Sequence, residues 1–189
     1  MDTLWQIVKY LHAKAEKDER DYYIPEAWNY FGYTAYGKDP ARPGEIRVSP
    51  YHFFHACLET QILAGKGDDV AGPVRLEGSA SLDAGTVIYG MFPRAFTAWY
   101  HGKSGRLSPG TFLKAMALLP LLKELGTGIV YLLPVFATGT KYTKGEMGSP
   151  YAIKNHYRLA PELHDPLLDE AFGVEQEFKA FVEACHCLG

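Results

Sequence analysis

The chain has 189 residues, of which 47% are apolar and 22% charged, and its formal net charge is −3. These values are typical of a folded globular protein and argue against an intrinsically disordered one. The 19 basic and 22 acidic residues are interspersed, so we expect neither nucleic acid nor a membrane as a partner. Aromatic residues reach 14%, and such rings either fill a core or stack on the faces of sugars.

The three cysteines, Cys57, Cys185 and Cys187, follow neither a disulfide framework nor a zinc-binding spacing. Free thiols are typical of a reducing compartment, so we expect a cytoplasmic protein and no metal site in this chain. The first residues show no basic segment ahead of an apolar core. No apolar run approaches the ~20 residues that span a bilayer.

Residues 1–84 are expected to form an α-rich N-terminal region. The spacing of apolar residues predicts a helix over 3–17, and a serine followed by proline predicts the start of a second helix over 51–63. Between them, 21–48 is rich in aromatic residues, glycine and proline and has little periodicity. We expect an irregular connection there.

From residue 85 the pattern changes to alternating strands and helices. Thr86–Phe92 predicts a short buried strand, and Gly110–Leu125 predicts a helix that Pro120 either kinks or divides. Ile129–Leu133 is apolar throughout, as expected of a second parallel strand covered on both faces.

A long segment, Val135–Phe172, separates the second strand from a helix predicted over Val174–Leu188. Connections of this size are usually functional. Strand–loop–helix units with long loops are typical of a (β/α)8 barrel, whose sites lie at the C-terminal ends of the strands. Gly189 falls where this architecture places its next strand, so we expect 85–189 to be an incomplete barrel, truncated before the third strand of a larger enzyme.

Segments in the expected order resemble the α-amylase superfamily, glycoside hydrolase family 13. Val87–Phe96 resembles the first strand of that family, and Leu118–Pro134 resembles its first helix and second strand. Gly148–Tyr157 resembles the turn that presents a tyrosine to the sugar, and Phe178–Gly189 resembles the helix before the third strand. Within that superfamily the chain is most similar to the bacterial maltosyltransferases, which move maltosyl units between α-1,4-glucans. This closer likeness is strongest over His164–His186 and extends into the N-terminal region.

The resemblance implies malto-oligosaccharides and α-1,4-glucans as substrates and a retaining double-displacement mechanism. In this mechanism an Asp nucleophile and a Glu acid/base act through a glycosyl-enzyme intermediate. In the family the catalytic carboxylates come from later strands, so we assign none here and expect this chain alone to be inactive. We expect no cofactor, because the family stretch often tied to calcium is also absent. Calcium binding and a homodimer stay open for the full-length protein.

The resemblance places Tyr151 under the sugar ring in the subsite where the bond is cleaved, and an aromatic ring suits the C–H face of a pyranose. Asn155 and His156 follow it, while Arg94 and His101 lie in the loop after the first strand, at the active-site end of the barrel. We take all five as candidate substrate-binding residues. For the last four, a structural role such as loop anchoring competes with sugar binding.

Gly148 and Asn155 stand where many hydrolases of the family have aspartate, and this departure favours transfer over hydrolysis. An α-glucan hydrolase of the amylase or neopullulanase type is the alternative within the class. A non-catalytic α-glucan-binding module is the alternative outside it. We do not expect Asp165 and Glu170 to form a catalytic pair, because the first lies in a predicted turn and the second on an exposed segment. The second strand is expected to expose an apolar edge that makes the chain unstable alone.

Overall fold

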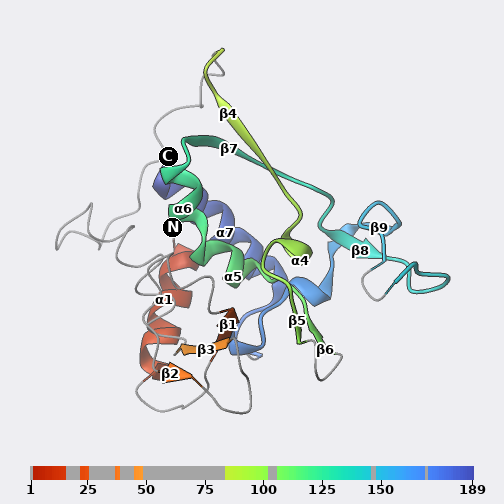
Figure 1. Ribbon diagram of the computed structural model, residues 1–189, viewed down its shortest axis with the longest axis horizontal. Helices are drawn as coiled ribbons and strands as arrows, with labels where there is room; N and C mark the ends of the chain where they lie inside the picture. The colour runs from red at the N-terminus through yellow and green to blue at the C-terminus, as the bar shows by residue number, and fades with distance from the viewer. Residues whose placement is uncertain are drawn as a thin grey trace.

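A computed structural model describes most of the second half of the chain and short parts of the first. The described residues are 2–15, 22–25, 37–38, 45–48, 84–101, 106–145, 148–168 and 170–189. Figure 1 shows a group of helices on one side and a strand pair with a projecting hairpin on the other. Within the described residues, no helix is both long enough and apolar enough to cross a bilayer.

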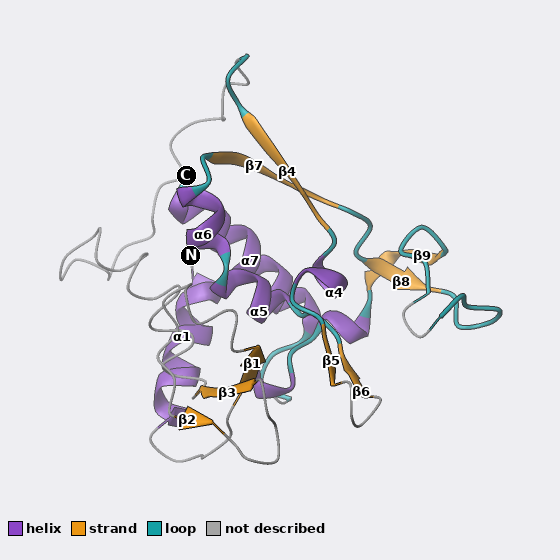
Figure 2. Cartoon of the chain, viewed as in Figure 1, coloured by secondary structure: helices purple, strands orange, loops and turns teal. Residues whose placement is uncertain are grey.

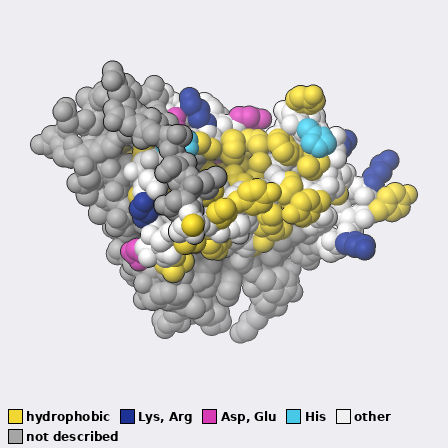
Figure 3. All heavy atoms as spheres, turned by 90° about the horizontal axis from the view of Figure 1, so that it is seen from above, with side chains coloured by type: hydrophobic (Ala, Val, Ile, Leu, Met, Phe, Trp, Pro, Cys, Tyr) yellow, Lys and Arg dark blue, Asp and Glu magenta, His cyan; other side chains and the backbone are white. Residues whose placement is uncertain are grey.

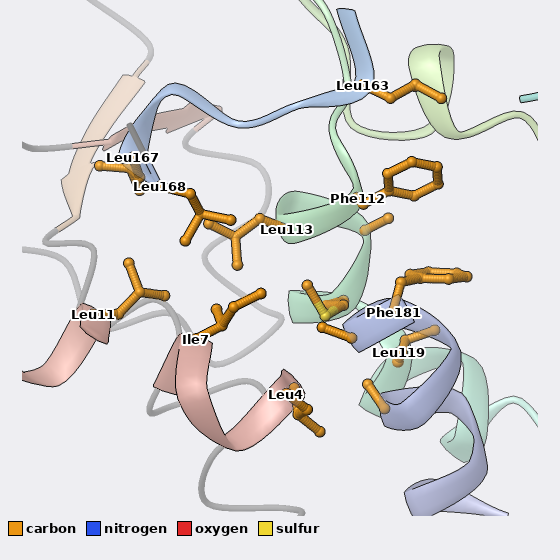
Figure 4. Close-up of a cluster of buried hydrophobic side chains, with 14 of the residues drawn as sticks. Leu4, Ile7, Leu11, Phe112, Leu113, Leu119, Leu163, Leu167, Leu168 and Phe181 are labelled. Atoms are coloured by element: carbon orange, nitrogen blue, oxygen red, sulfur yellow. The ribbon is translucent and has the colours of Figure 1, made fainter. Parts of the chain in front are cut away.

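Helix α7 (Val174–Leu188) packs against α1 (Asp2–Ala15), α5 (Phe112–Ala117) and α6 (Leu119–Glu124). The core between them consists of large apolar side chains that are almost fully buried, each stabilising the fold by about 1.5–3 kcal/mol. Figure 4 shows Leu4, Ile7, Leu11, Phe112, Leu113, Leu119, Leu163, Leu167, Leu168 and Phe181 in this cluster.

The predicted helices in these parts of the chain are confirmed. The helix expected over 110–125 is divided at Leu118, and Pro120 lies in the first turn of α6. N–H groups in a first turn have no partner within their own helix, so proline costs no hydrogen bond there. Gly126 follows α6 with a φ of +78°, a conformation that glycine adopts without strain. At the start of α7, the Gln176 side chain accepts a 2.8 Å hydrogen bond from the backbone N–H of Gly173.

Strands β4 (Val87–Met91) and β7 (Thr127–Leu132) form the predicted parallel pair, with Ile88 opposite Ile129 and Met91 opposite Leu132. Figure 2 shows this pair crossing above the helices. The parallel pairing is therefore confirmed. The (β/α)8 barrel as a whole stays a prediction.

The expectation that these strands are buried on both faces is wrong for this structure. Met91 is fully buried against the helices, but Ile88 is 59% and Tyr131 61% exposed. Alternate residues of a strand point to opposite faces, so Ile88 and Tyr131 lie on the opposite face from Met91, a face that no helix of the described residues covers. Seen from that side, hydrophobic side chains gather in a broad band (Figure 3).

The N-terminal region contains strands where an irregular connection was expected. The strands β1 (Tyr22–Pro25), β2 (Gly37–Lys38) and β3 (Glu45–Val48) form an antiparallel sheet in the order β1-β3-β2. The prediction failed because strands this short carry too few residues to show a periodicity. The helix predicted over 51–63 lies outside the described residues, and the domain boundary near residue 84 stays a prediction.

The loops after β4 and β7 contain elements of their own. The first holds α4 (Pro93–Phe96) and a hairpin of β5 (Trp99–His101) and β6 (Arg106–Ser108). The second holds a hairpin of β8 (Phe136–Thr138) and β9 (Ile153–Leu159), followed by the 3-10 helices η3 (Pro161–Leu163) and η4 (Pro166–Leu168). The long segment before α7 is thus largely ordered by its own hydrogen bonds.

Candidate functional site

The candidate site lies where β4 and β7 end side by side. Because the two strands are parallel, the chain leaves both at the same edge, into α4 and into the β8–β9 hairpin (Figure 1). Sites in α/β proteins lie at this edge. A pocket here is lined by Phe92, Pro93, Arg94, Pro134, Phe136, Thr138, Pro150, Ala160 and Leu163. Its volume of about 10 Å³ suits one water molecule and is too small to enclose a sugar ring.

Arg94 is buried at the start of α4 and is only 7% exposed. One guanidinium nitrogen donates a 2.8 Å hydrogen bond to Glu162 of η3, and another donates a 3.4 Å bond to the carbonyl of Gly148. The guanidinium carbon lies 5.4 Å from the ring centre of Phe92. Arg94 therefore connects the segment after β4 to two separate points in the segment after β7.

Tyr151 lies at the end of a tight turn that begins at Gly148. Gly148 has a φ of +61°, which favours glycine at this position. The Ser149 hydroxyl accepts a 3.3 Å hydrogen bond from the Tyr151 backbone N–H, and the Ser149 carbonyl accepts a 3.1 Å bond from Ala152. The Tyr151 side chain is 67% exposed, so its ring is available to a ligand.

The other predicted residues have different surroundings. The Asn155 side-chain oxygen accepts a 2.8 Å hydrogen bond from the backbone N–H of Tyr157, so this oxygen is used within β9. His156 is exposed, and its ring centre lies 6.0 Å from that of Phe136, which lines the pocket. His101 is in β5, but its side chain lies outside the described part of the structure. The structure thus brings Arg94 to the turn of Tyr151 and His156 beside Phe136.

A buried polar junction was missed by sequence reasoning. Asp165 and Glu177 are both fully buried, although Asp165 was expected in a turn and Glu177 was not singled out. The Thr111 hydroxyl donates a 2.6 Å hydrogen bond to Asp165, and the same hydroxyl accepts a 3.2 Å bond from the Lys114 N–H at the start of α5. Asp165 is therefore fixed to the N-terminal end of α5.

Glu177 joins three elements through one carboxylate. It accepts hydrogen bonds from the backbone N–H groups of Leu113, at 2.8 Å, and Asp165, at 3.0 Å, and the His164 Nδ1 lies 2.9 Å away. Burial, with the nearby Asp165 charge, raises the pKa of Glu177 to about 7, although the two backbone hydrogen bonds lower it. One signal was present in the sequence. Glu177 precedes Phe181 by four residues and therefore lies on the buried face of α7.

A second carboxylate of α7 performs a similar role. Glu183 is 8% exposed and accepts a 2.7 Å hydrogen bond from the backbone N–H of Leu4, in the first turn of α1. Such N–H groups have no partner within their own helix, and a negative charge there is favoured by the helix dipole. The acidic side chains of α7 thus stabilise the starts of two other helices.

Cys185 and Cys187 are free thiols, as predicted, and Cys57 lies outside the described residues. Burial raises the pKa of Cys185 to about 12, so this thiol stays protonated at neutral pH. In the described ranges no cluster of three or more His, Cys, Asp or Glu side chains is arranged to hold a metal ion.

No family model matches the chain. Over 111 residues, the chain is 32% identical to alpha-1,4-glucan:maltose-1-phosphate maltosyltransferases of Mycolicibacterium smegmatis, Mycobacterium tuberculosis and Arcanobacterium haemolyticum. The match covers 53% of this chain and 15–16% of those enzymes. The chain is therefore related to these maltosyltransferases, but it spans only about 15% of the length of the first two. Placement in glycoside hydrolase family 13 stays a prediction.

Proposed function

We propose that this chain is part of an enzyme that transfers maltosyl units to α-1,4-glucans. The similarity to three maltosyltransferases over 111 residues carries the proposal. The exposed ring of Tyr151, close to the C-terminal ends of two parallel strands, supports it, because an aromatic ring at this edge suits stacking on a glucose unit.

The names of the relatives suggest maltose 1-phosphate as the donor and an α-1,4-glucan as the acceptor. In the proposed reaction an enzyme carboxylate displaces phosphate: its bond to the anomeric carbon forms as the bond between that carbon and the phosphate oxygen breaks. A glucan hydroxyl oxygen then displaces the carboxylate from the anomeric carbon, and the hydroxyl proton passes to a general base. Two successive displacements at this carbon retain its configuration.

We propose that the catalytic carboxylates come from residues outside this chain. The buried carboxylates of Asp165 and Glu177 are committed to the junction of α5 and α7, and Glu162 is paired with Arg94. The 189-residue chain alone is then inactive. A cytoplasmic location, calcium binding and homodimer formation stay predictions for the whole enzyme.

The test uses the longest natural chain that contains these residues, supplied with maltose 1-phosphate and maltotetraose. Phosphate release together with products longer by two glucose units is the expected result, measured by a phosphate assay and chromatography. Short sugars formed without phosphate release would indicate an α-glucan hydrolase instead. Binding of maltotetraose without any product would indicate a non-catalytic module.

A further inference from the structure

We propose that Arg94 is a positioning residue, which holds the Gly148–Tyr151 turn at the edge of the strand pair and does not itself contact sugar. The identity of the ligand as an α-glucan rests on the proposed function. The positioning role rests on the geometry of Arg94 alone.

The contacts of Arg94 leave it little capacity to bind a ligand. Its side chain is 8% exposed, and its two terminal nitrogens are directed at Glu162 and at the Gly148 carbonyl. A guanidinium that reached a sugar on the surface would have to leave a partly buried carboxylate, whose side chain is 34% exposed. Separating a charge-assisted pair in such surroundings is unfavourable.

The contact with Gly148 joins two parts of the molecule that the hairpin does not join by itself. The hairpin's own hydrogen bonds, such as the 3.0 Å bond from Gly139 N–H to the Ala152 carbonyl, hold the turn to neighbouring hairpin residues. The Arg94 bond instead spans 54 residues and fastens the turn to the segment after β4. Pro150 of the turn and Arg94 also line the same small pocket.

This arrangement determines where the Tyr151 ring lies relative to the strand ends. The ring is exposed, so its own packing contributes little to its position. Its position therefore depends on contacts that hold the backbone of the turn. A planar guanidinium with several donors suits this role, because it bonds a carboxylate and a carbonyl at once. Lysine has one compact charge and can replace only part of these contacts.

The first measurement is hydrogen exchange of the longest natural chain without sugar, in the wild type and in Arg94→Met. Methionine keeps the apolar contacts and removes both hydrogen bonds. We expect exchange over 148–153 to be about fivefold faster, because a bond to a charged group is lost, with no change in α7. Glu162→Gln keeps the donor to Gly148 and is expected to change exchange in this turn less. Unchanged exchange in the turn of Arg94→Met would overturn the proposal.

The second measurement is a double-mutant cycle on maltotetraose affinity with Arg94→Met, Tyr151→Ala and the combined variant. A residue that acts only through Tyr151 has no further effect on affinity once the ring is removed. Arg94→Met should therefore weaken maltotetraose affinity in the wild type. The affinity of the combined variant should stay within about twofold of that of Tyr151→Ala. Equal weakening in both backgrounds would show direct contact with sugar and overturn the proposal. If faster exchange throughout α7 shows that Arg94→Met unfolds, Arg94→Lys replaces it in both measurements. If the wild type does not bind maltotetraose, the proposed function fails while the exchange result still decides the positioning role.

Discussion

The helical side of this chain buries charged groups with hydrogen-bond partners, whereas the strand side leaves large apolar groups exposed. At the junction of α1, α5 and α7, the buried carboxylates of Asp165, Glu177 and Glu183 all receive hydrogen bonds. On the strand side, Ile88 and Tyr131 remain more than half exposed although they lie in strands. On the helical side the core is closely packed and its buried carboxylates are hydrogen-bonded. The strand face instead exposes apolar area of the kind that another protein surface usually buries.

Unpaired polar atoms show the same contrast. Among the described residues, the buried side-chain atoms without a hydrogen-bond partner are Arg94 Nε, Thr97 Oγ1 and Thr127 Oγ1, all on the strand side. A buried polar atom without a partner costs about 1–3 kcal/mol. These unpaired buried atoms lower stability on the strand side, so stability resides mainly in the helices. Substitutions on each side test whether the helical side and the strand side differ in this way.

The largest effect is expected from Phe181→Ala in the core of the helical side. Phe181 is 2% exposed and its ring centre lies 5.8 Å from that of Phe112, so its removal should lower the free energy of unfolding by about 3–5 kcal/mol. Urea unfolding followed by circular dichroism measures the change. Tyr142→Ala on the hairpin, where the ring is fully exposed, is the control and should lie within about 0.5 kcal/mol of the wild type. Similar losses for both variants would contradict the contrast.

The buried Glu177 should make the fold more stable at acidic pH. Its pKa is about 7 in the folded chain against an ordinary 4.5, so the folded state binds more protons between these values and the free energy of unfolding falls as pH rises. The loss begins near pH 4.5, is complete somewhat above pH 7, and amounts to roughly 3 kcal/mol.

Urea unfolding at a series of pH values measures this slope. Glu177→Gln should flatten it between pH 5 and 7, because glutamine does not titrate. The exposed Glu175→Gln on the same helix is the matched control and should keep it. Identical slopes for the two variants would remove Glu177 as the cause.

On the strand side, Tyr151→Ala should weaken maltotetraose binding about tenfold in the longest natural chain, because the stacking surface is lost. The free energy of unfolding should change by less than about 0.5 kcal/mol, since the ring is exposed. Titration calorimetry measures the affinity. Tyr157→Ala is the matched control, because this ring is 98% exposed on the same hairpin and has no assigned ligand. Equal weakening by both variants would remove the special role of Tyr151.

The smallest effect is expected from Ile88→Thr combined with Tyr131→Thr on the exposed face of the strand pair. These substitutions should reduce self-association of the 189-residue chain, because the exposed apolar area shrinks. Sedimentation velocity over a range of concentrations measures association, with Tyr142→Thr, at a fully exposed ring outside the strand pair, as the control. A wild-type chain that is monomeric at all concentrations and unfolds cooperatively would contradict the expected instability.

Much of the fold could be predicted from the sequence wherever neighbouring residues decide it. Helix α7 has the predicted bounds, because apolar spacing and flanking glycines act within a few residues. The division of a helix at Leu118, just before Pro120, and the parallel pairing of β4 with β7 also follow from local chemistry and from the order of elements. Short strands such as β1 and β3 were missed, because each forms only by pairing with residues distant in the sequence.

The surroundings of the candidate site were decided by the tertiary structure. The sequence singled out Arg94 and Tyr151 by resemblance, but only the fold brings Arg94 to Gly148 and Glu162, which lie 54 and 68 residues along the chain. The fold likewise buries Asp165 beside Glu177. Periodicity and turn chemistry are encoded by adjacent residues, whereas burial, pKa shifts and ion pairs depend on groups that packing alone brings together.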